Sequence, residues 1–279
     1  MHNKKKILEK TLIYLVYVLI SLFFISPVLW TLSISLRPLR EVYKYPPKLF
    51  PSKIIFDNYI RVLHTSLLGR YLMNSLIIVL LTILGTLVLS VPASYVLSRI
   101  RHRAKGTIMI SILVFQMISP LIIAIPIYGY FEKLHLLNTF TGVIIAYIAI
   151  QLPFVTWLMK GYFDTIPLSI EEAAMIDGCS RFQTLRKIIL PLSLPGIATA
   201  TIFTAIQSWG QFIIPFVLLS DSRYFPISLG LYQYQAGKEA ITTHLIASAS
   251  IISIIPVVIG FLILQKFIVK SLTRGAIKG

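Results

Sequence analysis

Residues 71–98 read YLMNSLIIVLLTILGTLVLSVPASYVLS and contain no Asp, Glu, Lys or Arg. The run is longer than the roughly 20 apolar residues that an α-helix needs to cross the hydrocarbon core of a bilayer. Apolar and polar residues do not alternate along it, as they do in the strands of a membrane barrel. This run therefore predicts a helix that spans a membrane.

Five further runs lack these charged residues, at positions 11–36, 106–131, 134–159, 188–220 and 240–265. Of the 279 residues, 56% are hydrophobic and 13% are charged, and the mean hydropathy is +0.82. Soluble domains contain about 25% charged residues. The sequence therefore predicts an all-α membrane protein with six transmembrane helices. No connecting segment is long enough to bury a core of its own, so we expect residues 1–279 to form a single transmembrane domain.

The basic residues that give the chain its net charge of +16 are distributed as the expected membrane topology requires. Most Lys and Arg residues lie near the two termini and in the segments that follow the second and fourth apolar runs. Basic flanks of transmembrane helices stay in the cytoplasm. Both termini and a loop at about 160–191 are therefore predicted to be cytoplasmic, and loops at about 37–70 and 221–239 to be external. The lipid bilayer accounts for the basic surplus, and we expect no nucleic-acid partner.

An intramembrane enzyme would need a nucleophile with a base, or metal ligands, inside the spans. The five His residues are scattered without ligand spacing, and the single cysteine, Cys179, excludes an internal disulfide. The chain also lacks the Gly-x4-Gly-Lys-[Ser/Thr] motif that cradles nucleotide phosphates. We therefore expect a chain that is not an enzyme and has no catalytic residue, metal site or cofactor of its own.

Polar side chains and prolines occur inside the apolar runs. Non-helical backbone at membrane depth is tolerated only where neighbouring helices or a water-filled cavity provide hydrogen-bond partners for its N–H and C=O groups. The polar residues have two interpretations, hydrogen bonding between helices or a solute path, and the path candidates are Gln116, Ser119, Gln207 and Gln211. Gln207 and Gln211 are one helical turn apart and are expected on one helix face. No carboxylate lies within the runs, which argues against a proton relay, so energy must come from outside this chain.

The predicted cytoplasmic loop contains two short-helix signals. Ser169 with Glu172 forms the spacing of a capping box, and Ser180 with Gln183 forms a second one. Gly178 suits the left-handed position that ends the first helix. These signals predict a compact pair of helices, with Glu171 and Glu172 in the first turn, where acidic residues suit the helix dipole.

The same loop has a longer pattern. Glu172-Ala173-Ala174 is followed after three residues by Gly178 and after nine more by Ile188-Ile189-Leu190-Pro191. This pattern resembles the signature loop of permease subunits of ATP-binding-cassette (ABC) importers. The resemblance implies the type I ABC importer permease fold. It also implies a coupling helix that docks into a cytoplasmic ATPase, with Glu171, Glu172, Ala173, Ala174, Asp177 and Gly178 as the coupling residues.

Two other segments resemble maltose-type carbohydrate permeases. One is Asp57-Asn58-Tyr59 with the approach to the second helix at 70–76, and the other is the ending Gly275-Ala276-Ile277-Lys278-Gly279. They are similar to the second permease of those systems. The resemblance implies a tail that inserts between the ATPase subunits, through Arg274, Gly275, Lys278 and Gly279. One departure is Trp209-Gly210-Gln211, where the family often has Trp-Asn-Glu or Trp-Asn-Asp.

The resemblance also implies the partners. They are a second homologous permease, two cassette ATPases that bind ATP and Mg, and an external solute-binding protein, in a bacterial or archaeal plasma membrane. The binding protein would contact the external loop at 221–239, where the candidates are Arg223, Tyr224 and Phe225. The implied function is import of a sugar or oligosaccharide by alternating access. Import of glycerol phosphate, amino acids or peptides by the same machinery remains the alternative.

Overall fold

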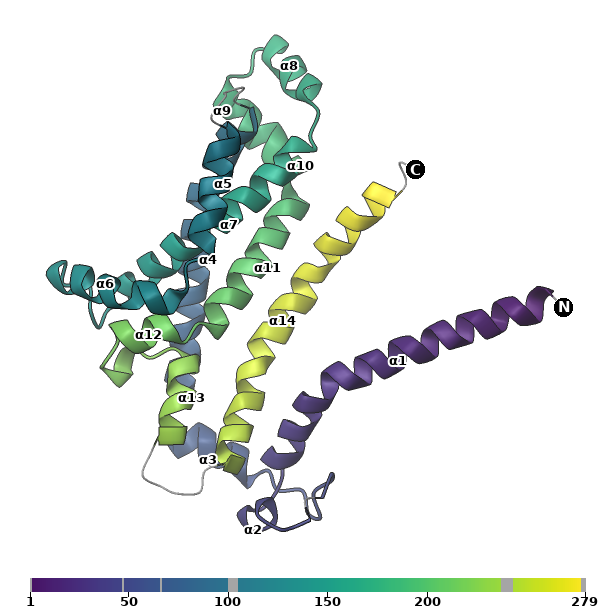
Figure 1. Ribbon diagram of the computed structural model, residues 1–279, viewed down its shortest axis with the longest axis vertical. Coiled ribbons are helices and arrows are strands. Elements are labelled where there is room, and N and C mark those ends of the chain that lie inside the picture. The colour runs from purple at the N-terminus through teal and green to yellow at the C-terminus, as the bar shows by residue number, and fades with distance from the viewer. Residues whose placement is uncertain (1, 47, 66, 100–104, 237–242, 277–279) are drawn as a thin grey trace. The chain divides into compact units, whose positions relative to one another are not determined.

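The computed structural model describes residues 2–46, 48–65, 67–99, 105–236 and 243–276, and this part of the chain contains helices and no strand (Figure 1). The longer helices are α1 (His2–Ser35), α3 (Asp57–Thr65), α4 (Leu68–Arg99), α5 (Lys105–Gln116), α6 (Pro120–Lys133), α7 (Phe140–Asp164), α8 (Leu168–Ile176), α11 (Leu194–Gly210), α13 (Ile227–Ala236) and α14 (Thr243–Ala276). Short helical segments are α2 (Leu39–Val42), α9 (Arg181–Thr184), η1 (Leu185–Ile189), α10 (Leu190–Leu192), α12 (Ile213–Leu218) and η2 (Ser222–Tyr224).

The described helices confirm a helical membrane protein. Four are long and apolar enough to cross a bilayer: Glu9–Ser35, Leu68–Arg99, Phe140–Asp164 and Thr243–Gln265. Two more candidate spans are pairs of helices joined at a sharp bend, Gly106–Gln116 with Pro120–Lys133 and Arg181–Leu192 with Leu194–Gly210. Counting each pair as one span gives the six that the apolar runs predict.

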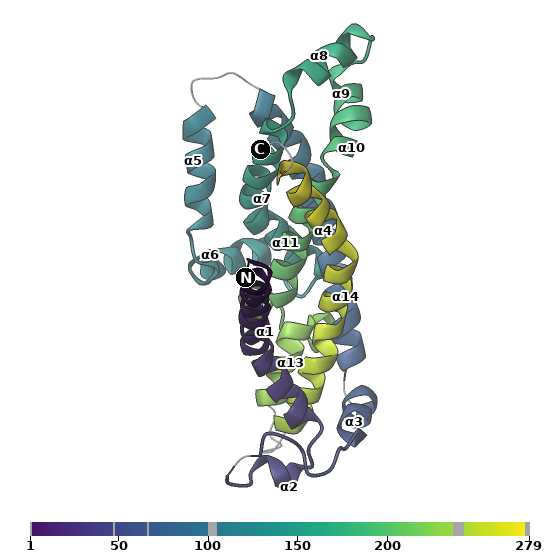
Figure 2. The same ribbon diagram turned by 90° about the vertical axis from the view of Figure 1, so that its right-hand side faces the viewer.

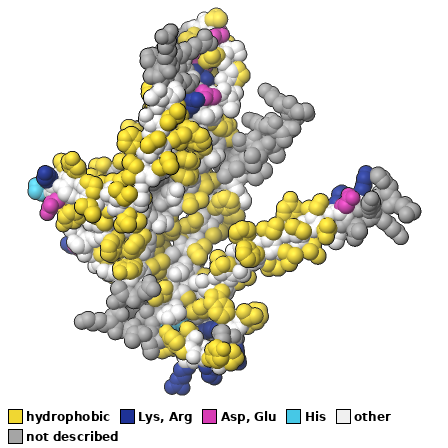
Figure 3. Space-filling view, in the orientation of Figure 1, with side chains coloured by type: hydrophobic (Ala, Val, Ile, Leu, Met, Phe, Trp, Pro, Cys, Tyr) yellow, Lys and Arg dark blue, Asp and Glu magenta, His cyan; other side chains and the backbone are white. Residues whose placement is uncertain are grey.

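Contacts divide the chain into two units, Met1–Leu68 with Leu231–Ile254, and Gly69–Gly230 with Ile255–Gly279. In the first unit, the Nδ2 of Asn58 donates to the backbone oxygens of Ser35 and Arg37 at 2.8 and 2.9 Å, which fixes the start of α3 on the end of α1. The apolar span of α1 is unburied, and hydrophobic side chains cover its length (Figure 3). Such a helix requires lipid or another chain around it.

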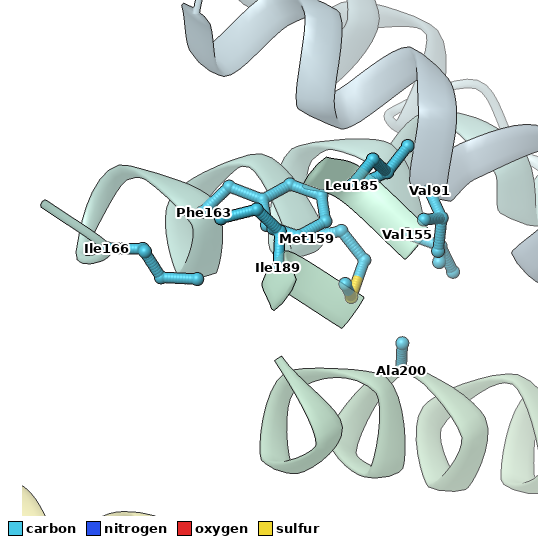
Figure 4. Close-up of a cluster of buried hydrophobic side chains, with 8 residues drawn as sticks. All are labelled: Val91, Val155, Met159, Phe163, Ile166, Leu185, Ile189 and Ala200. Atoms are coloured by element: carbon cyan, nitrogen blue, oxygen red, sulfur yellow. The ribbon is translucent and has the colours of Figure 1, made fainter. Parts of the chain in front are cut away.

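The second unit is built around α7, against which α5 and α11 pack, while α12 packs on α6. Its hydrophobic cluster lies where the last turns of α7 meet the segment that leads into α11 (Figure 4). The cluster consists of Val91, Val155, Met159, Phe163, Ile166, Leu185, Ile189 and Ala200. Because Phe163, Ile166, Leu185 and Ile189 lie within the predicted cytoplasmic loop at 160–191, the cluster packs the two ends of that loop against the helices α4, α7 and α11.

The third and fifth runs are not straight helices. α5 and α6 meet at 89°, a turn that is visible in Figure 2. Ser119 forms the N-cap of α6, with its Oγ accepting from the backbone nitrogen of Leu121, and Pro120 occupies the first turn, where its missing N–H costs nothing. The fifth run bends by 76° at Ser193, and its helix continues through Pro191 as α10.

Candidate coupling loop and translocation cavity

The loop between α7 and α11 contains the two predicted short helices, with one correction. α8 begins at Leu168 after Pro167, without a side-chain cap, so the predicted capping box of Ser169 and Glu172 is wrong. Pro167 has extended backbone angles and ends the preceding turn, which places Ser169 inside the helix, too late to cap it. The second box is confirmed, because Ser180 and Gln183 bond reciprocally at the start of α9.

Gly178 has the left-handed conformation that its position predicts, with a φ of +83°. The backbone nitrogen of Cys179 bonds to the oxygen of Ala174 at 3.0 Å, and that of Gly178 bonds to the oxygen of Met175 at 3.1 Å. Both bonds satisfy carbonyl groups that the end of α8 leaves free. The chain can therefore reverse within three residues and enter α9.

The predicted coupling residues divide into an outward and an inward set. Glu172, Ala173, Asp177 and Gly178 are exposed, whereas Glu171 and Ala174 are buried. Large apolar side chains accompany the outward set, because Ile176 is 86% exposed and Phe182 is 72% exposed. Exposed apolar side chains together with an exposed carboxylate indicate a surface for another protein. Phe182 therefore belongs to that surface, whereas Leu185 and Ile189 of the following segment are buried.

Glu171 points back to α4. Its Oε1 accepts from the Nε of Arg99 at 2.6 Å, and its Oε2 accepts from the hydroxyl of Tyr95 at 2.8 Å. A groove of about 480 Å³ lies beside these residues, between α4 and the α8–α9 segment. The loop sequence does not indicate Arg99 or Tyr95 as partners, because both precede Glu171 by more than 70 residues.

A cavity of about 410 Å³ unites three of the four predicted path residues, Gln116, Gln207 and Gln211. Ser119 is the N-cap of α6 and does not line this cavity. The other side chains lining it are apolar or neutral, and they come from α5, α6, α7, α11 and the connection between α5 and α6. Gln151 also lines it and donates to Ser208 at 2.9 Å, which is the helix-to-helix bonding that the sequence left as the other interpretation.

Gln207 and Gln211 do not share a helix face, because α11 ends at Gly210 and Gln211 has extended backbone angles. The backbone oxygen of Gln211 accepts from the hydroxyls of Tyr147 at 3.3 Å and Ser228 at 2.8 Å. Side chains from neighbouring helices therefore satisfy the carbonyl that the helix break frees, as membrane burial requires.

The three residues predicted to contact the binding protein lie just before α13. Most of the described residues of the predicted external loop at 221–239 are helical, because they belong to η2 or α13. Arg223 is exposed, Tyr224 is partly buried, and Phe225 is buried with its ring 6.2 Å from that of Tyr71. The guanidinium of Arg223 bonds to Asp221 at 2.6 Å, and this hydrogen bond holds the pKa of the Asp221 carboxyl below its usual value. Within this chain, Arg223 presents the most accessible of the three side chains.

Two asparagines hold this segment in place, and neither was a predicted site residue. The Nδ2 of Asn74 donates to the backbone oxygens of Arg223 and Phe225, both at 2.9 Å. The Oδ1 of Asn138 accepts from the backbone nitrogens of Ser220 and Asp221 at 2.6 and 3.0 Å. Asn138 has a φ of +55°, which asparagine tolerates better than most residues.

The predicted ATPase-contacting tail is only partly described. Arg274 and Gly275 lie in the last turn of α14, whereas Lys278 and Gly279 lie outside the described residues. The helix thus continues through the first half of the segment 274–279 that the sequence predicts as a tail.

A family model described as "Binding-protein-dependent transport system inner membrane component" matches residues 90–274. The chain belongs to this family. The match includes the loop with α8 and α9, and all four helices that line the cavity.

Individual relatives agree with the family. The trehalose/maltose transport system permease protein MalG of Thermococcus litoralis is 33% identical over 278 residues, which cover 99% of each chain. The sulfoquinovosyl glycerol transport system permease protein SmoH of Agrobacterium fabrum is 32% identical over 255 residues, covering 91% of this chain and 88% of its own. A solved bacterial ABC transporter that imports the acidic polysaccharide alginate contains a chain with 26% identity and a TM-score of 0.80, matched over 93% of this chain and 96% of that one.

The comparisons confirm several predictions. The chain has the ABC importer permease fold and is a multi-pass component of the inner membrane. It is the permease subunit of a binding-protein-dependent importer, whose ATP is bound by separate ATPase subunits, and it is not itself catalytic. A solute-binding protein works with the transporter.

Proposed function

We propose that this permease imports a neutral sugar or oligosaccharide. The observation that supports this most directly is the cavity lining, which combines Gln116, Gln151, Gln207 and Gln211 with aromatic and aliphatic side chains. None of the described residues that line the cavity is charged. Amide groups can both donate to and accept from sugar hydroxyls, and aromatic faces suit the apolar faces of sugar rings.

The relatives support a carbohydrate as the solute. The printed names of the compared permeases include trehalose and maltose, which are neutral, and sulfoquinovosyl glycerol, which carries a charged sulfonate. The restriction to a neutral carbohydrate therefore rests on the cavity lining. Glycerol phosphate, amino acids and peptides carry charges that a site normally meets with opposite charges. The absence of any described cation or carboxylate from the lining therefore argues against these alternatives.

We further propose the assembly and its cycle. A second homologous permease completes the passage, and two cassette ATPases bind the cytoplasmic face of both permeases and drive alternating access. The outward face of α8, with Glu172, Ala173, Asp177 and Gly178, docks on one ATPase. Arg223 meets the binding protein on the external side, and the exposure of these side chains supports both assignments.

The solute class can be tested on the intact complex. The complex is purified through a tag on this chain, placed in nanodiscs with its binding protein, and assayed for ATP hydrolysis. Maltose, trehalose, alginate trisaccharide, glycerol 3-phosphate, single amino acids and a tripeptide are compared as stimulants. We expect stimulation by a neutral saccharide, and stimulation only by alginate trisaccharide, glycerol 3-phosphate, an amino acid or the tripeptide would overturn the proposal.

The cavity can be tested in the same preparation. Gln207→Leu removes one exposed amide from the lining. Because a single hydrogen bond contributes about 0.5–1.5 kcal/mol, the saccharide concentration for half-maximal stimulation of ATP hydrolysis should rise about twofold to twelvefold. Gln265→Leu is the matched control, since Gln265 lies on α14 and does not line the cavity. Equal behaviour of the two variants would remove Gln207 from the path.

A further inference from the structure

Glu171 has no free carboxylate oxygen for a partner protein. Arg99 donates its Nε to Oε1 at 2.6 Å, and Tyr95 donates its hydroxyl to Oε2 at 2.8 Å. Arg99 and Tyr95 belong to the last turns of α4, whereas Glu171 belongs to the first turn of α8. The contact therefore joins two helices that are more than 70 positions apart in the sequence.

The same arginine extends the contact to α7. Its Nη2 donates to the backbone oxygen of Ile166 at 3.3 Å, and its Nη1 donates to the Oγ of Ser98 at 3.2 Å. Ser98 in turn donates to the Oδ1 of Asp164 at 2.6 Å, and Lys160 pairs with the other carboxylate oxygen at 2.5 Å. We call the set Tyr95, Ser98, Arg99, Lys160, Asp164 and Glu171 the loop network.

Burial separates the central ion pair from an ordinary surface pair. The side chains of Arg99 and Glu171 are 15% and 6% exposed, whereas those of Arg61 and Asp57 in α3 are 62% and 56% exposed. Solvent and side-chain entropy leave an exposed pair with little net effect. Removing one partner from a buried pair leaves an unpaired charge, which is strongly unfavourable. The loop network thus fixes the orientation of α8 far more firmly than a surface contact could.

Resting on the proposed docking of α8 on an ATPase, we propose that Arg99, Glu171 and Tyr95 are positioning residues that make α8 and the end of α4 move as one body. Two short peptide segments connect α8 to α7 and α9, and each could act as a hinge. The loop network adds a third connection, to a helix that runs the length of the membrane span. A displacement of α8 by the ATPase is then passed directly to α4. Glu171 acts inside the permease, and Glu172 beside it faces the partner.

The test detects the joint movement of α8 and the end of α4, and it needs no transported solute. The intact complex in nanodiscs is analysed by hydrogen–deuterium exchange, without nucleotide and with ATP and vanadate. Peptides that cover α8 and residues 91–99 of α4 report the two helices separately. In the unmodified complex, nucleotide should change the exchange of both segments. A change in α8 without a change in α4 would overturn the proposal.

The decisive variant is the double substitution Arg99→Met with Glu171→Leu. It leaves no unpaired buried charge, so the complex should assemble in normal amounts. Nucleotide should still change exchange in α8, but the change in α4 should be lost. The matched control removes the exposed pair with Arg61→Met and Asp57→Leu and should behave like the unmodified complex. An α4 response that persists in the Arg99 and Glu171 double variant would overturn the proposal.

If α8 does not dock on an ATPase, the exchange experiment gives a different result from the one expected if only the positioning role is wrong. If nucleotide leaves α8 unchanged in the unmodified complex, then α8 does not receive the ATPase signal, and both ideas are wrong. If α8 responds and α4 does not depend on the ion pair, only the positioning role is wrong. A merely structural pair predicts lower yield in the single variants and a fully normal response in the double variant.

Discussion

Gly178 is the residue at which backbone conformation matters most in the coupling loop. Its φ of +83° costs a residue with a Cβ atom roughly 1–2 kcal/mol, and an added Cβ would meet nothing within 4 Å. Gly178→Val should therefore strain the turn without any clash. We expect normal membrane insertion with reduced uptake per ATP hydrolysed, measured in proteoliposomes. Gly161→Val, in open space on helix α7, should leave that ratio unchanged.

At the residue scale, the sequence predicted the turn but not the direction of each glutamate. Gly178 and the box of Ser180 and Gln183 follow from local rules, because φ and capping depend on neighbouring residues. Which of Glu171 and Glu172 faces inward depends on Arg99, whose place beside α8 is set by tertiary packing. No local spacing contains that information.

At the scale of one element, Asn74 determines how the segment before α13 lies on α4. Asn74→Ala would leave the backbone oxygens of Arg223 and Phe225 without this donor. The loss of a donor to buried carbonyls costs about 1–3 kcal/mol. We expect a lower midpoint of thermal unfolding for the purified permease in detergent. The neighbouring substitution Met73→Ala, at an exposed position, should change the midpoint little, and equal shifts would contradict the role of Asn74.

The apolar runs predicted the number of membrane elements well but not their shape. A run reports how much apolar length is available, and it says nothing about where a helix stops inside the membrane. The bend before Pro120 and the break after Gly210 depend on packing of α6 against α12 and on the hydroxyls that satisfy Gln211. Three of the four residues predicted for the path do line one cavity, because glutamines in apolar runs are conspicuous in the sequence alone.

At the scale of the whole molecule, a truncation at the end of the chain can test whether the tail contributes to assembly with the ATPases. The family match ends at residue 274, and α14 continues to Ala276. Truncation after Thr273 removes two cations, Arg274 and Lys278, that would suit an acidic interface. We expect normal insertion with less ATPase retained on the purified complex, measured by the ratio of the subunits. Full retention would show that the tail makes no required contact.

The neutral lining of the cavity has an electrical consequence. Each elementary charge that crosses a membrane gains or loses about 2.3 kcal/mol per 100 mV of membrane potential. A neutral solute that passes neutral side chains such as Gln116 and Gln207 moves no net charge through that field. Uptake by the reconstituted complex should therefore be the same when a potassium diffusion potential of either sign is imposed. The importer would then depend on ATP alone and keep its rate in a cell whose membrane has lost its potential.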